Sequence, residues 1–296
     1  MDTKKFEILE KITDLGSLSL AAEALGLTQP AVSHSLAALE EEFGFALMRR
    51  SRIGARLTGE GEKIMPFIRR VLREEEQLQQ TAAALRGLTA GTVRIATFTS
   101  IAVHWLPAII REFEQLHPQI SFTLFNGDYH DVDRWLSDGS ADLGFITLPT
   151  SLDCECIFLK EDRLMAVLPP RHPLAERDAC PVAELAREPF ISLPDNSDND
   201  ARLALKAASI RPDVRFTTKD DYAILAMVAQ GLGVSVVPEL LLEGTSQDIA
   251  IRPLDPPSSR ALALAVPAGE KAGPATRRFA EYVVEWVRRD PSHRPE

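Results

Sequence analysis

The sequence predicts a chain of three parts: an N-terminal helix-turn-helix unit, a long helix, and a C-terminal α/β domain. Three observations lead to this fold class. Two short helical patterns flank a glycine at position 26, and apolar residues recur at spacings of four and three between positions 64 and 85. From position 92 onward, strand-like and helix-like patterns alternate. The 296 residues are enough for more than one domain.

The first part is organised around residues 19–58. Ser19 is the expected N-cap of a short helix, and Gly26 can take the positive φ that ends it. Thr28 then caps a second helix, in which Pro30 is tolerated because first-turn amides have no intrahelical acceptor. The predicted buried faces are Leu20, Ala21, Ala24 and Leu25 in the first helix, and Val32, Leu36, Leu39 and Phe43 in the second.

The outer face of the second helix carries small polar side chains. Gln29, Ser33 and His34 lie largely opposite the apolar stripe, and no Lys or Arg occurs between Thr28 and Phe43. Contacts to bases would therefore rest on these three residues. Residues 49–56 then place four arginines around a glycine, which is typical of a hairpin tip, or wing, pressed on phosphates.

A family resemblance becomes specific at this point. The run AAEALGLTQPAVSHSLAALEEEFGFALMRR, followed by Leu57-Thr58, resembles the winged helix-turn-helix of LysR-type transcriptional regulators. The resemblance includes the core Leu-x-x-Thr-Gln-Pro-Ala-Val-Ser and covers essentially the whole chain. It implies a cytoplasmic regulator with a small-molecule sensor domain, whose winged helix-turn-helix spans residues 1–58. The expected DNA-binding residues are Thr28, Gln29, Pro30, Ser33, His34, Arg50, Arg52 and Arg56.

Composition sets limits on the partners. The net charge of −10 argues against nonspecific binding of polyanions by the whole surface, but it allows a local basic site such as the wing. The N-terminus has no apolar core of the signal-peptide type. Residues 223–242 are interrupted by glycines, a proline and a glutamate, so they read as a buried helix and strand. We expect no membrane contact.

The long helix is predicted over residues 59–88, followed by a short hinge from Gly87 to Gly91. Its apolar positions form a heptad seam, which predicts a homodimer through this helix, and the family resemblance implies a homotetramer. The alternative is a helix that lies on its own domain. The predicted seam consists of Ile64, Ile68, Val71, Leu78, Ala82 and Leu85.

The third part alternates strands and helices, which predicts an α/β domain with largely parallel sheets. The expected strands are Thr92–Thr97, Ile120–Phe125, Ala141–Thr147, Leu164–Leu168, Phe190–Leu193, Val234–Val237 and Ala261–Val266. The expected helices are Val103–Leu116, Asp131–Asp138, Ala201–Ser209, Tyr222–Gln230 and Thr276–Arg288. The resemblance implies a periplasmic-binding-protein-like effector domain over residues 89–296. Its subdomain I would take 89–161 and 267–296, and subdomain II 162–266, with the chain crossing near Glu161 and Val266.

Hydroxyl groups at strand ends mark a candidate ligand site. Ligands of open α/β sheets bind beyond the carboxyl ends of strands, and by resemblance these hydroxyls converge on a cleft between the subdomains. No Lys or Arg lies in the turn at residues 97–100, so we expect a small carboxylate effector. The alternative is that these residues merely cap helices. The expected effector-binding residues are Thr97, Thr99, Ser100, Thr147 and Ser192.

Other motifs do not indicate a metal, a cofactor or catalysis. Cys154-x-Cys156 could be a redox or metal pair, but no second Cys/His pair at metal spacing accompanies it, which favours ordinary reduced thiols. The acidic run 195–200 lacks the glycine and distal glutamate of a calcium loop. Gly231-x-Gly233 follows a helix and reads as a tight turn. No nucleophile-elbow motif occurs, so we expect no enzyme.

The sequence therefore predicts a sequence-specific DNA-binding transcriptional regulator that responds to a small carboxylate. Two rivals stay open. One is a ligand-binding or metabolic enzyme domain with a vestigial helix-turn-helix, against which the intact residues 28–35 and the wing arginines weigh. The other is a constitutive DNA-binding protein that takes no ligand.

Overall fold

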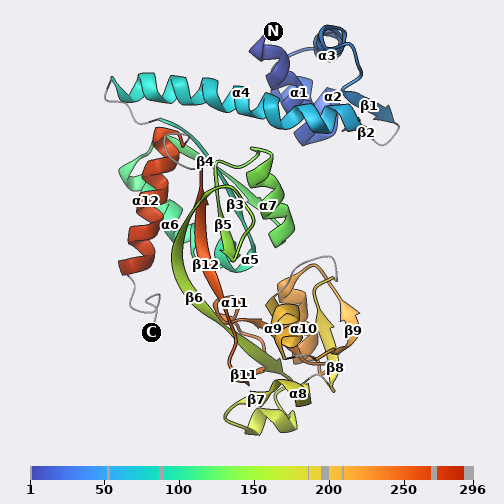
Figure 1. Cartoon of the computed structure of the whole chain (residues 1–296), viewed down its shortest axis with the longest axis vertical. Coiled ribbons are helices and arrows are strands. Elements are labelled where there is room, and N and C mark those ends of the chain that lie inside the picture. The colour runs from blue at the N-terminus through green and yellow to red at the C-terminus, as the bar shows by residue number, and fades with distance from the viewer. Residues whose placement is uncertain are drawn as a thin grey trace. The chain divides into compact units, whose positions relative to one another are not determined.

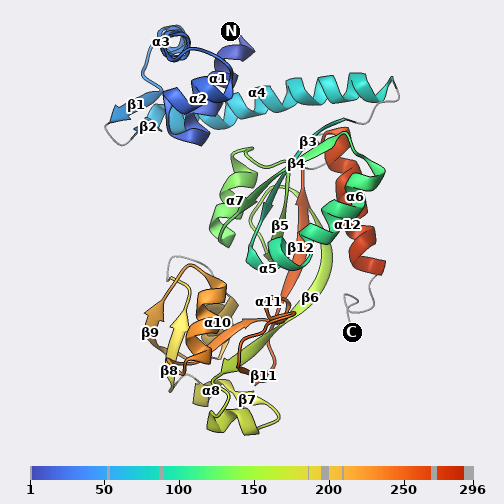
Figure 2. The same cartoon turned by 180° about the vertical axis from the view of Figure 1, so that it is seen from behind.

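The computed structural model describes residues 2–51, 54–86, 90–185, 187–194, 200–208, 210–267 and 272–289 (Figures 1 and 2). The chain forms two compact units. The N-terminal unit contains Met1–Leu88 together with the short segment Ser137–Ser140, and the C-terminal unit contains Thr89–Leu136 and Ala141–Glu296. In the part of the chain that the structure describes, no helix is long and apolar enough to cross a membrane.

The N-terminal unit is a winged helix-turn-helix followed by a long helix, as predicted (Figure 1). β1 and β2 pair as an antiparallel hairpin, with Met48 opposite Leu57 and Ser51 opposite Gly54. The hairpin is the predicted wing. The elements are α1 (Thr3–Leu15), α2 (Leu18–Ala24), α3 (Gln29–Phe43), β1 (Met48–Ser51), β2 (Gly54–Leu57) and α4 (Gly59–Ala84).

Short polar contacts fix the ends of α3. The Thr28 hydroxyl accepts a hydrogen bond from the backbone nitrogen of Ala31 at 3.3 Å, which is the predicted N-cap. One carboxylate oxygen of Glu40 accepts from the backbone nitrogens of Leu47 and Met48 at 2.7 and 3.1 Å. This side chain ties the start of the wing to α3. The predicted stripe of α3 faces the core, where Val32, Leu36 and Leu39 are buried and Phe43 is half-buried.

The helix α2 begins two residues earlier than the sequence predicts. Ser17 is its N-cap and accepts from the backbone nitrogen of Leu20 at 3.4 Å, so the expected cap at Ser19 is wrong. The buried face also differs in part from the prediction, because Leu20 is 51% exposed. The residues that face the core are Leu18, Ala21 and Ala22.

The helix α4 packs on its own unit over its first half. Met65, Ile68 and Leu72 are buried in the N-terminal core, and Ile68 is only 2% exposed. The predicted dimer seam is therefore wrong at Ile68, and the alternative of a helix lying on its own domain holds for this half. Three other residues of the predicted seam, Val71, Leu78 and Leu85, are exposed, and with Phe67 they form an apolar stripe on the surface of α4 and its C-cap.

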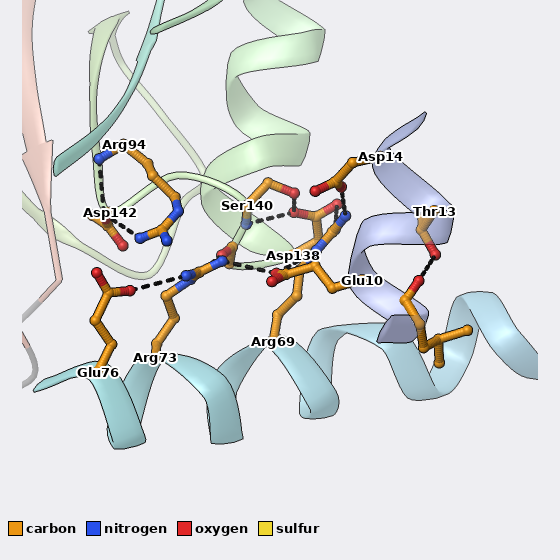
Figure 3. Close-up of polar contacts among 12 residues, drawn as sticks. Glu10, Thr13, Asp14, Arg69, Arg73, Glu76, Arg94, Asp138, Ser140 and Asp142 are labelled. Carbon is orange, nitrogen blue, oxygen red and sulfur yellow. Dashed lines mark hydrogen bonds and ion pairs between the residues drawn. The ribbon is translucent and has the colours of Figure 1, made fainter. Parts of the chain in front are cut away.

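Two arginines of α4 hold an ion cluster in the N-terminal unit (Figure 3). Arg69 lies 2.7 Å from a carboxylate oxygen of Asp138, which belongs to the segment Ser137–Ser140. Arg73 lies 2.8 Å from a carboxylate oxygen of Glu10 in α1. The Arg69 side chain is only 9% exposed, so these carboxylates compensate a charge that has lost most of its water.

The C-terminal unit is built on a mixed sheet with the order β4-β3-β5-β12-β6-β11-β7, and β10 also pairs with β6. In the first subdomain, α6 and α12 cover one face of the sheet and α7 lies on the other (Figures 1 and 2). The elements of this subdomain are β3 (Gly91–Thr97), α5 (Thr99–His104), α6 (Leu106–Leu116), β4 (Ile120–Asn126), α7 (Tyr129–Ser137), β5 (Leu143–Leu148), β12 (Ser259–Val266) and α12 (Pro274–Arg289).

The second subdomain has two apolar cores of its own, and β8 and β9 pair in a small parallel sheet. The strand β6 (Glu155–Leu168) passes through both subdomains. The remaining elements are η1 (Pro173–Glu176), β7 (Cys180–Pro181), α8 (Val182–Leu185), β8 (Pro189–Ser192), α9 (Asp200–Ala207), β9 (Asp213–Thr217), α10 (Asp221–Ala229), β10 (Ser235–Pro238), α11 (Glu239–Leu242) and β11 (Ala250–Asp255).

The structure contains β9, β11 and the first half of β6, none of which is among the expected strands, and it differs from the predicted α/β pattern in three further ways. The sheet is mixed instead of largely parallel, because β12 and β6 run antiparallel to each other and β12 also runs antiparallel to β5. The expected helix over residues 103–116 is two helices that meet at Trp105. The expected return crossing near Val266 lies instead at the start of β12, since residues 261–265 already pair with β5.

Candidate functional site

The first candidate surface is the start of α3 and the wing. Thr28, Gln29, Pro30 and His34 are exposed, and Ser33 is half-buried. The four exposed residues lie within two turns of the N-terminus of α3, away from the stripe that packs into the core. This is the position of the base-reading helix in a helix-turn-helix protein.

The wing brings positive charge next to α3. Arg50 in β1 donates a hydrogen bond from Nη2 to the Ser33 hydroxyl oxygen at 3.2 Å, which joins the wing to the predicted reading helix. Arg49, Arg50 and Arg56 are exposed on the hairpin. Their guanidinium groups can contact phosphates while α3 contacts bases. Arg52, which the sequence also assigns to DNA binding, lies outside the described residues.

The second candidate site is a cavity of about 260 Å³ in the C-terminal unit. Thr99 and Ser100 line it from the first subdomain, as the sequence predicts, and Leu193 and Pro194 line it from the second. Thr97, Thr147 and Ser192 lie outside the described lining, and Thr97 is fully buried. The other described lining residues are Phe98, Asn126, Gly127, Asp128, Tyr129, Asp131, Lys219, Asp221, Pro238, Leu241 and Arg260.

Arg260, which sequence reasoning missed, organises one wall of this cavity. Its side chain is 5% exposed, and its guanidinium lies 2.8 and 2.6 Å from Oδ2 of Asp162, whose side chain is 2% exposed. It also donates to the Ser100 hydroxyl oxygen at 2.8 Å and to the Tyr129 hydroxyl. Its guanidinium lies over the Phe98 ring, 5.1 Å from the centroid.

These contacts connect five elements through one buried ion pair. Arg260 comes from β12 and Asp162 from β6, the two strands by which the chain passes between the subdomains. The other carboxylate oxygen of Asp162 accepts from the backbone nitrogen of Leu240 in α11 at 3.0 Å. The sequence does show an arginine at the start of an apolar strand, which is an unusual position for a charged residue. It does not show the partner, because Asp162 lies 98 residues away along the chain.

The ion pair determines whether the Ser100 hydroxyl donates or accepts a hydrogen bond towards a ligand. A guanidinium can only donate hydrogen bonds, so the Ser100 oxygen must accept from Arg260. The hydroxyl hydrogen of Ser100 is then available to donate to a third group. Ser100 lines the cavity and is 3% exposed, so this donor is held in place inside a largely desolvated site. Such a wall suits a ligand atom that accepts hydrogen bonds.

Charged residues at the other walls have mixed signs. Lys219 is an exposed cation in the lining. Asp128 accepts from the backbone nitrogen of Asp131 at 2.9 Å and thereby caps α7, and Asp131 forms an ion pair with Arg134. Both carboxylates are therefore already partnered within α7 and its cap.

The thiols of Cys154 and Cys180 are not activated as catalytic nucleophiles. Burial, a hydrogen bond with Cys156 and nearby carboxylates raise the pKa of the Cys154 thiol to about 12. Burial raises the pKa of the Cys180 thiol to about 11. Both thiols are protonated at neutral pH. Among the described residues, no group of three or more His, Cys, Asp or Glu side chains is placed to hold a metal ion. The acidic run 195–200, which lacks the sequence features of a calcium loop, lies largely outside the described residues.

Comparisons with known proteins agree for both units. Residues 3–62 match the family described as "Bacterial regulatory helix-turn-helix protein, lysR family", and residues 86–288 match "LysR substrate binding domain". The HTH-type transcriptional regulator YvbU of Bacillus subtilis is 33% identical over 288 residues, covering 96% of this chain and 98% of that protein. The probable regulator LrrA of Synechococcus elongatus is 31% identical, covering 95% and 96%.

Solved structures share the fold over nearly the whole chain. A full-length variant of OxyR from Pseudomonas aeruginosa has a TM-score of 0.77 at 23% identity and covers 99% of this chain and 100% of its own. Full-length CbnR complexed with its target DNA has a TM-score of 0.66 at 22% identity, covering 96% and 99%.

Proposed function

The chain belongs to the LysR family of DNA-binding transcriptional regulators, and on that premise we propose which of its residues read DNA, join protomers and bind the effector. The proposal rests on the presence of two sites in one chain. The exposed start of α3 lies beside three exposed wing arginines. The cavity of the C-terminal unit is lined by Ser100, whose hydroxyl oxygen accepts from Arg260 and whose hydrogen can donate to a ligand. The protein acts in the cytoplasm, where it meets DNA, and the cavity binds a ligand without catalysis.

DNA binding is assigned to α3 and the wing. Thr28, Gln29, Pro30, Ser33 and His34 contact the major groove, and Arg50, Arg52 and Arg56 contact phosphates. Gln29 is the best base reader because it is exposed at the first position of α3 and its amide can form two hydrogen bonds with adenine. The wing supplies nearby charge, because no Lys or Arg occurs in α3.

Replacing Gln29 with alanine is expected to relax sequence preference. A good bidentate base contact contributes about 1–3 kcal/mol of discrimination, so the ratio of specific to random DNA affinity should fall by about 5- to 150-fold. Fluorescence anisotropy on the upstream intergenic DNA and on a shuffled duplex measures this ratio. Gln115→Ala, an exposed change in α6, is the matched control. An equal loss for both duplexes would make Gln29 a backbone contact.

Replacing Arg56 with alanine is expected to weaken binding to all duplexes similarly. Each lost phosphate contact lowers the magnitude of the slope of log K against log salt by about 0.9, because fewer counterions are released. Titrations at several salt concentrations measure the slope. Arg171→Ala, which removes an exposed arginine of the C-terminal unit, should leave it unchanged. An unaltered slope for Arg56→Ala would show that this residue does not contact DNA.

Dimerisation is assigned to the apolar stripe of α4 and its C-cap. Leu78 is 69% exposed, and Leu85 is 86% exposed. Phe67 and Val71 lie on the same stripe, with spacings of four and seven along the helix. Large apolar side chains aligned in this way favour a helix of a second copy as the partner. Two such dimers form the homotetramer that the family resemblance implies.

The effector is a small carboxylate that binds Ser100 and Thr99. A cavity of about 260 Å³ is small for a ligand site, for which about 300–1,000 Å³ is usual. The Ser100 hydroxyl, fixed as a donor by Arg260, matches a carboxylate oxygen, which only accepts. Lys219 places a cation at the same cavity. An effector regulates only if its affinity differs between two arrangements of the protein.

Replacing Ser100 with alanine is expected to abolish stabilisation by the effector. The change also removes one hydrogen bond of Arg260, so the unliganded protein should lose about 1–3 kcal/mol. Melting temperatures with a panel of organic acids and neutral analogues identify an acid that stabilises the wild-type protein. Ser259→Ala, next to Arg260 but outside the described lining, is the matched control. Equal stabilisation of Ser100→Ala and wild type would exclude Ser100, and a neutral ligand would exclude a carboxylate.

A further inference from the structure

Two cysteine sulfurs lie close together at the start of β6. Cys154 immediately precedes the strand, and Cys156 is its second residue. Their Sγ atoms are 3.6 Å apart. Cys156 is exposed and is held in the sheet opposite Ala265 of β12, whereas Cys154 is half-buried against the core of the first subdomain.

The distance between the sulfurs limits what can bridge them. If a shared atom forms two bonds of about 2.3 Å to thiolates, as zinc does, a separation of 3.6 Å sets the S–X–S angle at about 100°. This angle suits a tetrahedral or pyramidal centre. A linear two-coordinate ion would need the sulfurs to be about 4.6 Å apart at the same bond length. The pair is therefore arranged for a bent bridge.

Two other occupants fit less well. A structural zinc ion takes four protein ligands, and the described residues offer no group of three or more metal-binding side chains. A disulfide would need the sulfurs to approach to about 2.05 Å. Residues two apart in a strand have Cα atoms about 6.6 Å apart, close to the upper limit of about 6.8 Å for a disulfide. The pairing of Cys156 with β12 opposes that closure.

We propose that Cys154 and Cys156 form a chelating site for trivalent arsenicals, separate from the effector cavity. Trivalent arsenic is pyramidal and thiophilic, and it needs only two protein sulfurs when its third position carries a hydroxyl or an organic group. With an organoarsenic oxide, both S–H bonds and the arsenic–oxygen double bond break, two arsenic–sulfur bonds form, and the two thiol hydrogens leave with the oxygen as one water molecule. No electron is transferred. The exposed Cys156 reacts first, and Cys154 closes the ring.

The test uses the full-length protein and phenylarsine oxide, measured by intact mass. We expect one adduct per chain, heavier by the reagent less one water. It should survive millimolar glutathione, a monothiol, and be released by 2,3-dimercaptopropanol, because a chelate resists single thiols. Cys154→Ser and Cys156→Ser should each lose the glutathione-resistant adduct. Cys180→Ser, which changes a fully buried thiol in another core, should keep it.

Three results would overturn the proposal. They are a wild-type protein without a glutathione-resistant adduct, retention of that adduct by Cys154→Ser or Cys156→Ser, and a zinc complex that excludes the arsenical at equal concentration. The last would indicate a four-ligand metal site. Circular dichroism of each variant separates loss of the site from loss of the fold. If Cys180→Ser unfolds, alkylation of the native wild-type protein with mapping of the modified thiols replaces it.

Discussion

Replacing Asp162 with alanine is expected to destabilise the C-terminal unit by about 3–5 kcal/mol. The change leaves the Arg260 guanidinium, 5% exposed, without the carboxylate that compensates its charge. It also removes the acceptor for the backbone nitrogen of Leu240. Urea denaturation of the full chain, monitored by circular dichroism, measures this change. The unfolding transition of the C-terminal unit should have its midpoint at a lower urea concentration than in the wild-type protein.

A matched control lies next to Asp162 in the same strand. Glu161 is exposed and accepts a hydrogen bond from Ser259. Glu161→Ala should change stability by no more than about 0.5 kcal/mol, as surface substitutions usually do. Equal effects of the two changes would mean that the buried ion pair is not a major support of this unit. A double change, Asp162→Leu with Arg260→Met, should recover much of the loss, because it removes both charges.

Two glutamate substitutions on α4 are expected to have opposite outcomes. Ile68→Glu places a carboxylate in the N-terminal core, where the native side chain is 2% exposed, and should unfold this unit at a cost of several kcal/mol. Leu78→Glu changes a side chain that is 69% exposed and should leave the fold intact. In a symmetric dimer Leu78 occurs twice, so the dissociation constant should rise at least about a hundredfold.

Sedimentation equilibrium and circular dichroism separate these outcomes. Leu78→Glu should show a native circular dichroism spectrum and a smaller mass in solution than the wild-type protein. Ile68→Glu should show a loss of helical signal. Gln79→Ala, an exposed change adjacent to the stripe, is the control for Leu78→Glu and should keep the wild-type mass. A Leu78→Glu protein with the wild-type mass would show that the exposed stripe does not join protomers.

The helix-turn-helix could be predicted from the sequence because its signals are local. The Thr28 cap, the spacing of Val32, Leu36 and Leu39, and the arginines of the wing all lie within 30 residues. The α4 helix shows the limit of such patterns. Ile68 and Val71 are three residues apart and can belong to one seam by spacing alone, but Ile68 faces the core and Val71 faces solvent. Only the packing of α1 and the wing decides between the two faces.

The ligand cavity was predictable only in part. Thr99 and Ser100 follow directly from the end of a strand, which is a local signal. Arg260 and Asp162 lie on β12 and β6, and no pattern in either strand shows that these strands pair. The middle of β6 carries three consecutive charged residues, Lys160, Glu161 and Asp162, which are not typical of a buried strand. The contact between Arg260 and Asp162 therefore depends on a long-range pairing of strands that local sequence patterns do not predict.

The ion cluster around Arg69 and Arg73 makes the N-terminal unit discontinuous along the chain. A fragment that ends at Leu88 would contain every complete helix and strand of this unit, but it would lack the carboxylate of Asp138. Arg69 would then keep its buried position with fewer compensating charges. The isolated segment is therefore expected to be less stable than the same residues are in the intact chain.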